Sequence, residues 1–343
     1  MSKILSILHK MQELREPVPT YALFAGIRPD TLLKVRVDLE GFDIVEEVDV
    51  VLYSNGGSAG DAYRMIRTFR ERFKIVNIIV PFWAKSAATL FAFGASRMVL
   101  HEFGELGPID AQIKQDREDD PGEAWVSALN VHSSLEQIEK RSREGMVEAF
   151  TKLRDESGIK IGRRQLADML LDYSAKFYAP LLQKIETIEL GAMSRNLNIG
   201  KMYAMRILKQ YTDINDLVAE KFLDFLVYEC PDHGYVIDYY LLKTYLSHVI
   251  RADEEPFGSD YYSQLGKLSI ATMEPGWKES VGFIDNLINN LNEKNVSEKK
   301  YKEKRDGRSV GESGGFGVGS SEDDGAESIS GERPPRRKIR VVP

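Results

Sequence analysis

Two short segments combine residue types that acyl transfer requires. Asn55-Gly56-Gly57 follows an apolar run at 48–53, and paired glycines after a strand can turn backbone N–H groups toward a ligand. Ser86 follows a second apolar run, at 74–80, and stands at the start of a segment of small and apolar residues. A serine hydroxyl at such a strand-to-helix turn would face the crevice where open α/β sheets bind ligands.

Each segment also has an ordinary structural explanation. A Gly-Gly pair is a common tight turn, and serine is a common N-cap residue. Together, however, the two segments meet the needs of acyl transfer, which are a nucleophile and two N–H donors around the developing oxyanion. We therefore expect Ser86 to be the nucleophile and the N–H groups of Gly57 and Ala87 to form an oxyanion hole, provided that the two strand ends are neighbours.

Three ordered motifs resemble the serine dehydrogenase proteinase family, a relative of the Clp protease proteolytic subunit and of signal peptide peptidase A. They are Asn55-Gly56-Gly57, Lys85-Ser86-Ala87-Ala88-Thr89-Leu90 and Leu106-Gly107-Pro108-Ile109-Asp110-Ala111-Gln112. Further similarity lies at Tyr178-Ala179-Pro180, Glu189-Leu190-Gly191, Ser194-Arg195 and residues 232–238, so that the resemblance covers about 15–250. Relatives usually carry Met and Gly where this chain has Lys85 and Ala88.

The resemblance implies a Clp-protease/crotonase-like fold of repeated ββα units with a helical C-terminal extension. It implies a serine endopeptidase that acts on peptide or protein substrates through an acyl-enzyme, without a cofactor. Relatives assemble into closed rings or stacks, so the resemblance also implies a homo-oligomer. Two other functions stay open: an inactive scaffold or oligomeric binding module that kept the fold, and an acyl-CoA enzyme that uses the oxyanion hole without a nucleophilic serine.

The general base that a serine nucleophile needs is not evident. The place of the Clp histidine falls at Ile109 or Asp110 in this chain, and we expect Asp110 to orient a neighbour rather than to act as base, because an ordinary carboxylate is too weak. His132 and Lys140 share one face of a predicted long helix and are candidates, either in the same chain or from a neighbouring subunit. Lys85 is a third candidate, and each of these side chains has a solvated helix face or surface as its plainer explanation.

Composition excludes several other functions. The net charge of −7 argues against a nucleic-acid partner, and no glycine-rich dinucleotide motif follows a strand. The single cysteine, Cys230, lacks a glycine-rich oxyanion loop and fits a reducing compartment, which predicts a cytoplasmic protein. His233 and Asp238 are too isolated to form a metal site, so none is expected.

The elements that must position these groups follow from the apolar pattern. Strands are predicted at 48–53, 74–80 and 97–100, with helices at 59–72 and 86–95 between them, and this alternation predicts an α/β fold with parallel pairing. Later segments have the periodicity of helices. These are 124–156, 163–187, 201–210, 214–227 and 239–250, with a last amphipathic turn or two at 281–291.

The chain is expected to divide into four parts: an amphipathic N-terminal helix at 1–16, a catalytic core at 17–122, a mainly helical extension at 123–292, and a disordered charged tail at 293–343. The N-terminal helix is expected to pack on the body, with membrane-surface contact as the alternative, and no apolar run is long enough to span a membrane. The apolar run at 222–227 lies either in the core or in a subunit interface.

Overall fold

The computed structural model describes residues 3–40, 45–109, 112–115, 124–153, 162–183, 187–275 and 278–293. Contacts between residues divide the chain into two units, Met1–Glu293 and Lys294–Pro343. The tail predicted from residue 293 lies outside the described residues, apart from Glu293 itself. The predicted boundary between residues 122 and 123 falls inside the first unit.

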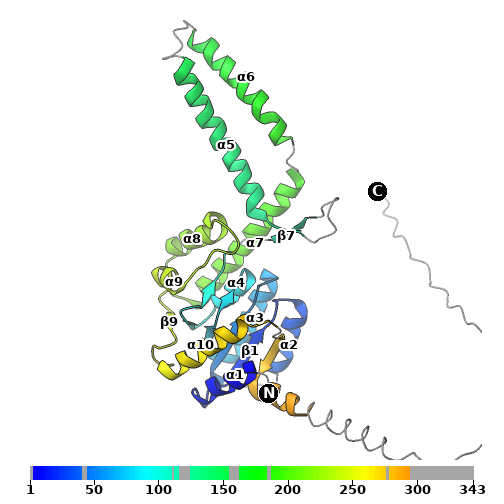
Figure 1. Cartoon of the computed structure of the whole chain (residues 1–343), viewed down its shortest axis with the longest axis vertical. Helices are drawn as coiled ribbons and strands as arrows, with labels where there is room; N and C mark the ends of the chain where they lie inside the picture. Colours follow the sequence, from blue (N-terminus) through cyan, green and yellow to red (C-terminus); the bar gives the residue numbers. More distant parts are fainter. Residues whose placement is uncertain are drawn as a thin grey trace, which may run out of the picture. The chain divides into compact units, whose positions relative to one another are not determined.

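A mixed six-stranded sheet forms the centre of the first unit (Figure 1). In order across the sheet, the strands are β10 (Ser280–Phe283), β1 (Thr20–Phe24), β2 (Val45–Tyr53), β3 (Phe73–Val80), β5 (Arg97–Leu100) and β9 (Val249–Arg251). Only the β1–β10 pair is antiparallel among them. The predicted α/β class and the parallel pairing of the first three predicted strands are confirmed.

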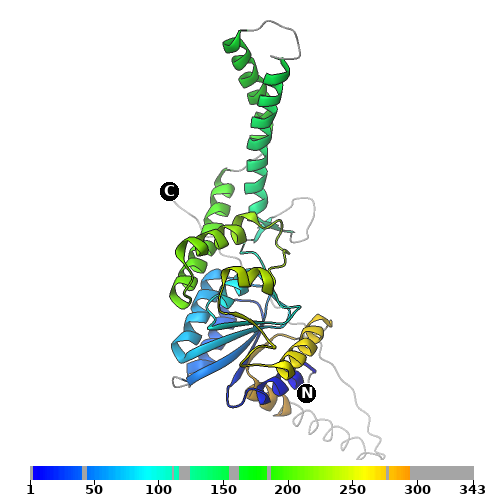
Figure 2. The same cartoon turned by 90° about the vertical axis from the view of Figure 1, so that its left-hand side faces the viewer.

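Helices cover both faces of this sheet (Figures 1 and 2). On one face lie α2 (Pro29–Glu40), α3 (Ala59–Arg72) and α4 (Ala87–Ala92), and on the other lie α1 (Lys3–Glu13) and α10 (Ser259–Met273). The strands are apolar on both sides because each face has its own core, as buried parallel strands require. The predicted packing of the N-terminal helix on the body is confirmed, since Leu8 and Met11 are fully buried in the second core.

The remaining helices are α5 (Ala128–Thr151), α6 (Arg163–Leu182), α7 (Thr187–Tyr211), α8 (Asp216–Asp224) and α9 (Tyr239–Tyr245). A π-helical turn at Phe225–Glu229 continues α8. Two short strand pairs complete the structure: β4 (Trp83–Ala84) with β6 (Glu105–Leu106), and β7 (Gln112–Gln115) with β8 (Ala124–Ser127). Residues 284–293 are helical.

Several predicted helices were wrong at their ends. The helix predicted over 163–187 ends at Leu182, and the one predicted over 201–210 belongs to α7, which begins at Thr187. The helix predicted from 124 begins only at Ala128, because 124–127 pair with β7. The helix predicted over 239–250 ends at Tyr245, because Val249–Arg251 join the sheet beside β5. The helix predicted over 86–95 ends at Ala92, and at Gly94 a Cβ would lie 2.2 Å from Cγ1 of Ile66 on α3. Backbone packed this closely on α3 therefore requires glycine.

The apolar run at 222–227 belongs to the core of a single chain. Phe222, Leu223, Leu226 and Val227 are fully buried in the same core as α3 and α4. Its alternative interpretation as a subunit interface was wrong, because nothing of these four side chains is left to contact a partner.

Candidate active site

Ser86 occupies the turn between β4 and α4 in a backbone conformation that side chains rarely adopt. Its φ is 52° and its ψ is −117°, and it is the one non-glycine residue with positive φ among the described residues. Such a conformation costs about 1–3 kcal/mol and persists where the surrounding structure imposes it. The Ser86 side chain makes no capping hydrogen bond to α4. Ser86 is thus the N-cap residue of α4 by position, as the structural explanation had it, but its side chain does not cap the helix.

Thr89 holds this turn in place from inside the protein. Its buried hydroxyl lies 2.9 Å from the carbonyl oxygen of Ala84 and 2.8 Å from that of Gly107, which share its single proton, and it accepts from the N–H of Gly107 at 3.2 Å. One hydroxyl thus ties the first turn of α4 to the ends of both β4 and β6. Because these bonds are buried, they oppose any relaxation of Ser86 to an ordinary conformation.

The glycine turn lies directly against the serine turn. The N–H of Lys85 donates to the carbonyl oxygen of Ser54 at 3.0 Å, and the N–H of Ser54 donates to that of Trp83 at 3.3 Å. Gly56 has a φ of 94°, and a Cβ there would lie 2.5 Å from the Lys85 carbonyl oxygen. The predicted adjacency of the two strand ends is confirmed, and Gly56 is glycine because the other turn leaves no space for a side chain.

Gly57 is constrained from the opposite side. Its φ is 142°, and a Cβ there would lie 2.3 Å from the carbonyl oxygen of Ile27. The flanking residues bond to Ile27, since the Ile27 N–H donates to the Gly56 carbonyl oxygen at 2.7 Å and the Ser58 N–H donates to the Ile27 carbonyl oxygen at 2.8 Å. The loop after β1 therefore fixes the orientation of the Gly57 peptide.

Two backbone donors remain beside Ser86. Within the described part of the chain, the N–H groups of Gly57 and Ala87 donate to no protein acceptor, whereas that of Gly56 donates to the hydroxyl oxygen of Ser54 at 3.1 Å. These two N–H groups are the ones that the sequence predicts for an oxyanion hole. Unpaired donors that are already oriented can stabilise developing negative charge without reorganisation.

A cleft of about 570 Å³ opens over these groups. Its walls are the glycine turn and the start of α3 (residues 55–60), the serine turn, and α7. The lining residues outside 55–60 are Ser86, Ala87, Leu90, Ile109, Asn196, Ile199, Gly200 and His233. Ser86 is half-buried and lines this cleft, so a substrate in the cleft could contact it.

The base candidates named from the sequence do not gather at this cleft. The Lys85 ammonium pairs with Glu105 and donates to the Leu106 carbonyl oxygen at 3.4 Å. Lys140 is exposed on α5 and does not line the cleft. Asp110 and the side chain of His132 lie outside the described residues, so their roles stay predictions.

His233 is a cleft residue that sequence reasoning missed. It was considered only as a metal ligand and set aside as isolated, although the segment 232–238 already resembled the peptidase family. The structure places it in the wall of the cleft that contains Ser86. That resemblance could have identified His233, because it marked a segment with a histidine as part of the region similar to a serine peptidase.

Two other reactive side chains lie elsewhere. The Cys230 thiol is buried and does not line the cleft, which leaves it no contact with a substrate there. His101 packs against the ring of Tyr262 on α10, with ring centroids 4.4 Å apart, and burial lowers its pKa. Among the described residues, no group of three or more His, Cys, Asp or Glu side chains is arranged to hold a metal ion.

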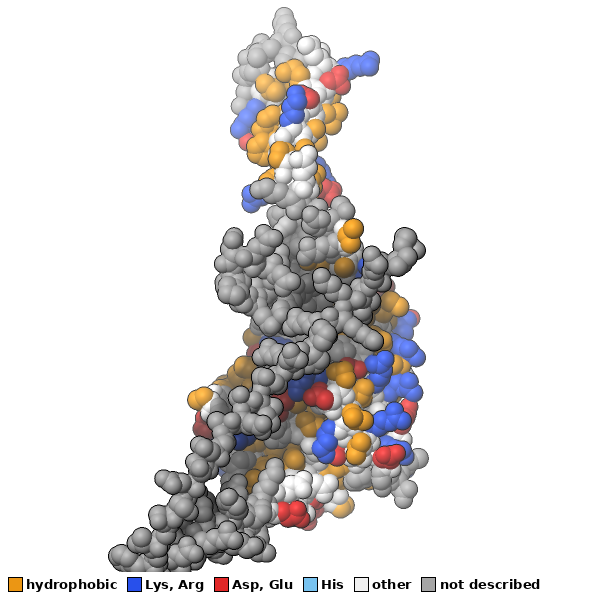
Figure 3. Space-filling view, turned by 90° about the vertical axis from the view of Figure 1, so that its right-hand side faces the viewer, with side chains coloured by type: hydrophobic (Ala, Val, Ile, Leu, Met, Phe, Trp, Pro, Cys, Tyr) orange, Lys and Arg blue, Asp and Glu red, His pale blue; other side chains and the backbone are white. Residues whose placement is uncertain are grey.

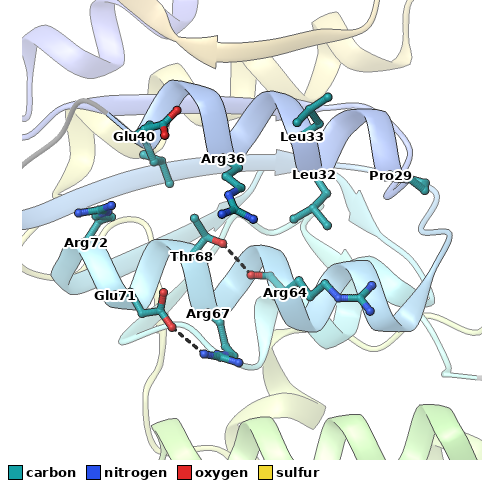
Figure 4. Close-up of a pocket in the computed structure, with 11 residues that line it drawn as sticks. Pro29, Leu32, Leu33, Arg36, Glu40, Arg64, Arg67, Thr68, Glu71 and Arg72 are labelled. Atoms are coloured by element: carbon teal, nitrogen blue, oxygen red, sulfur yellow. Dashed lines mark hydrogen bonds and ion pairs between the residues drawn. The ribbon is translucent and has the colours of Figure 1, made fainter.

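A groove of about 530 Å³ lies between α2 and α3 (Figure 4). Four arginines and two glutamates line it, together with leucines of α2: Arg36, Arg64, Arg67, Arg72, Glu40, Glu71, Leu32, Leu33 and Leu39. Arg67 pairs with Glu71 at 2.8 Å, and Arg64 pairs with Asp61 at 2.9 Å. On the side of the molecule that carries α2, basic, acidic and hydrophobic side chains are interspersed rather than gathered by type (Figure 3).

None of the helices formed by the described residues combines the length and apolar character that crossing a membrane requires. No family model matches the chain. The chain is similar to two uncharacterized proteins of Methanocaldococcus jannaschii, MJ0137 and MJ1495, each with 22% identity. The matches cover 115 and 116 residues, which are 33% of this chain in both cases, and 39% and 38% of the two relatives. The matched part thus spans less than two fifths of the length of these curated relatives.

Proposed function

We propose that the protein is a serine hydrolase that cleaves peptide bonds through an acyl-enzyme on Ser86. The observation that carries this proposal is the conformation of Ser86. Its backbone is strained, its side chain makes no capping hydrogen bond, and it lines a cleft together with Gly57 and Ala87, whose N–H groups are unpaired. Strain of this kind is retained where it serves a function. A serine hydroxyl and two oriented donors are the groups that acyl transfer needs.

In this mechanism the Ser86 hydroxyl oxygen attacks the substrate carbonyl carbon. The N–H groups of Gly57 and Ala87 receive the negative charge that develops on the carbonyl oxygen. The amine leaves as the tetrahedral intermediate collapses to an ester on Ser86, and water then hydrolyses this ester. No cofactor is required by any of these steps.

The architecture supports the finer assignment to the Clp-protease/crotonase-like folds with a helical extension. Parallel strands alternate with helices, and the small β4–β6 pair supports the serine turn beside the ends of β2 and β3. A single buried cysteine is consistent with a cytoplasmic location, which we include in the proposal. An inactive scaffold of the same fold is the alternative, and the strain at Ser86 argues against it because a scaffold gains nothing from this conformation.

Assembly into a homo-oligomer stays a prediction. Because the run at 222–227 is buried, the surface that supports this prediction is another one, on α6. The chain exposes a set of large apolar side chains on α6, and hydrophobic side chains gather over the α5–α6 hairpin (Figure 3). The set consists of Met169, Leu171, Tyr173, Phe177, Leu181 and Leu182. Light scattering of the purified protein at micromolar concentration tests this, and a mass of 38.9 kDa at every concentration would contradict it.

Labelling with a fluorophosphonate probe tests the proposed activity. The wild-type chain should react at Ser86, and Ser86→Ala should abolish labelling, because alanine has no hydroxyl oxygen to form the bond to the probe. The matched control is Ser247→Ala, at an exposed serine outside the cleft, which should react like the wild type. A folded Ser86→Ala protein that labels fully would refute the proposal.

A further inference from the structure

His233 is the one imidazole in the wall of the Ser86 cleft as the structure describes it. Within the described residues, no Asp, Glu, Lys, Arg or Cys side chain lines this cleft. The other lining side chains are apolar, hydroxyl or amide groups, none of which accepts a proton near neutral pH. A serine nucleophile requires a proton acceptor. His233 is therefore the lining group that can serve.

The loop that carries His233 is held firmly on both sides. Cys230, buried before it, donates its N–H to the Phe225 carbonyl oxygen at 3.1 Å. Ile237, buried after it, exchanges two backbone hydrogen bonds with Leu106, at 2.9 and 3.2 Å. The imidazole thus stands on a short surface turn that is anchored at both ends.

The anchor of this loop also connects it to the serine. Leu106 belongs to β6, which pairs with β4, and β4 leads directly into Lys85 and Ser86. The same β6 segment continues to Gly107, whose backbone bonds to Thr89 in the first turn of α4. One small strand therefore bonds both to the segment that carries the nucleophile and to the end of the His233 loop.

We propose that His233 is the general base of Ser86 and acts within the same chain; this inference rests on the serine hydrolase function proposed above. The imidazole takes the hydroxyl proton as the Ser86 Oγ–carbon bond forms. It gives this proton to the departing amine nitrogen as the carbon–nitrogen bond breaks. In the second half, it takes a proton from the attacking water and returns it to Ser86 Oγ as the ester bond breaks.

The rival bases are less suitable in this structure. Lys85 is engaged by Glu105 and by the Leu106 carbonyl oxygen, and it does not line the cleft. Lys140 is exposed on α5, away from the cleft lining. A site completed by His233 needs no residue of a neighbouring subunit, so the activity of a monomer becomes part of the inference.

The rate of fluorophosphonate labelling measures the base directly, because Ser86 must lose its proton as it displaces fluoride from phosphorus. His233→Gln should lower this rate about 10²–10⁴-fold, the usual contribution of a general base. The matched control is His9→Gln on α1, a half-exposed histidine on the other face of the sheet, which should label like the wild type. Lys140→Met tests the rival base and should also label normally.

A chemical rescue separates a base from a structural role. Imidazole added to His233→Gly should restore labelling in proportion to its concentration, because a free imidazole can then take the hydroxyl proton in place of the missing side chain.

The possible results are distinguishable. Normal labelling of His233→Gln, with none of Ser86→Ala, would overturn the assignment of the base and leave the serine hydrolase standing. Loss of labelling in His233→Gln without any imidazole rescue in His233→Gly would likewise overturn it, because a structural defect does not respond to imidazole. No labelling of the wild type would remove the proposed function and this inference together.

Discussion

The cleft at Ser86 and the groove between α2 and α3 have similar volumes, about 570 and 530 Å³, but they are built from different groups. Backbone N–H groups, a serine and an imidazole line the cleft, at the end of β4 and beside the end of β2. The groove is lined by long side chains on two helices, and Arg67 already pairs there with Glu71 (Figure 4).

This difference shows that the size of a hollow says little about chemistry. In the cleft, strain at Ser86 and the close approach of Gly56 and Gly57 to neighbouring backbone keep the reactive groups in one arrangement. In the groove, flexible arginines can rotate, and part of their charge is already neutralised. Oriented groups without protein partners stabilise a transition state, whereas paired surface ions contribute little.

The largest effect on stability should follow from a side chain at Gly57. Gly57→Ala should lower the free energy of unfolding by about 3 kcal/mol or more, because the methyl group meets the Ile27 carbonyl oxygen and the backbone has positive φ. A Gly57→Val variant is therefore a poor test of the oxyanion hole, since it would disturb the fold as well as the activity.

Gly60→Ala is the matched control for Gly57→Ala in denaturant titrations. At Gly60 the nearest atoms to a new Cβ are 3.7 Å away, and alanine favours the helix that begins there. Equal stability of Gly57→Ala and Gly60→Ala would contradict this prediction. It would show that the backbone of the cleft at Gly57 is not constrained by its neighbours.

Titratable groups outside the cleft should affect stability and leave labelling unchanged. Burial, and then the charges of Lys243 and Arg70, lower the pKa of His248 from 6.5 to about 4. As the pH falls below 6.5, His248 becomes protonated in the unfolded chain but stays neutral in the folded chain. Stability should therefore be complete above pH 6.5 and decline toward pH 4, by about 2 kcal/mol for this partly exposed group.

Denaturant titrations between pH 7 and 4 check this expectation. His248→Gln should show a weaker loss of stability across that window than the wild type does. Its labelling rate at pH 7 should equal that of the wild type. A changed labelling rate in His248→Gln would show that His248 affects the Ser86 cleft, and would contradict the expectation that titratable groups outside the cleft affect stability alone.

A smaller effect is expected from relieving the strain at Ser86. Ser86→Gly should be more stable than Ser86→Ala by about 1 kcal/mol, because glycine adopts the conformation at φ 52° without a Cβ clash but loses more entropy on folding. Both variants should be inactive, so the melting temperature is the measurement. Equal melting temperatures would mean that the strain is absent in solution.

The smallest effects should come from the groove. Arg67→Ala removes one member of an exposed ion pair four residues apart on α3. Probe labelling should stay within about twofold of the wild type, because isolated surface pairs contribute little and this one is outside the cleft. A large loss of labelling would show that the groove takes part in the activity after all.

Local pattern predicted several elements in the first half of the fold, although β1 and α2 were not predicted. The apolar runs at 48–53, 74–80 and 97–100 and the amphipathic pattern at 59–72 each reflect their neighbours along the chain, so their elements form as expected. The glycine and serine turns could also be placed, because a Gly-Gly pair and a serine after a strand are local signals. Their adjacency followed from parallel pairing of consecutive strands.

Only the tertiary structure decided which distant residues complete the site and the sheet. The strand at 249–251 was predicted as helix, because its pairing with β5 depends on a segment far away in the sequence. His233 reaches the cleft because β6 holds its loop, a contact that no periodicity records. The strain at Ser86 is likewise imposed by Thr89 and the neighbouring turn. Sequence pattern reports local geometry, whereas these features arise from contacts between segments that meet only when the chain folds.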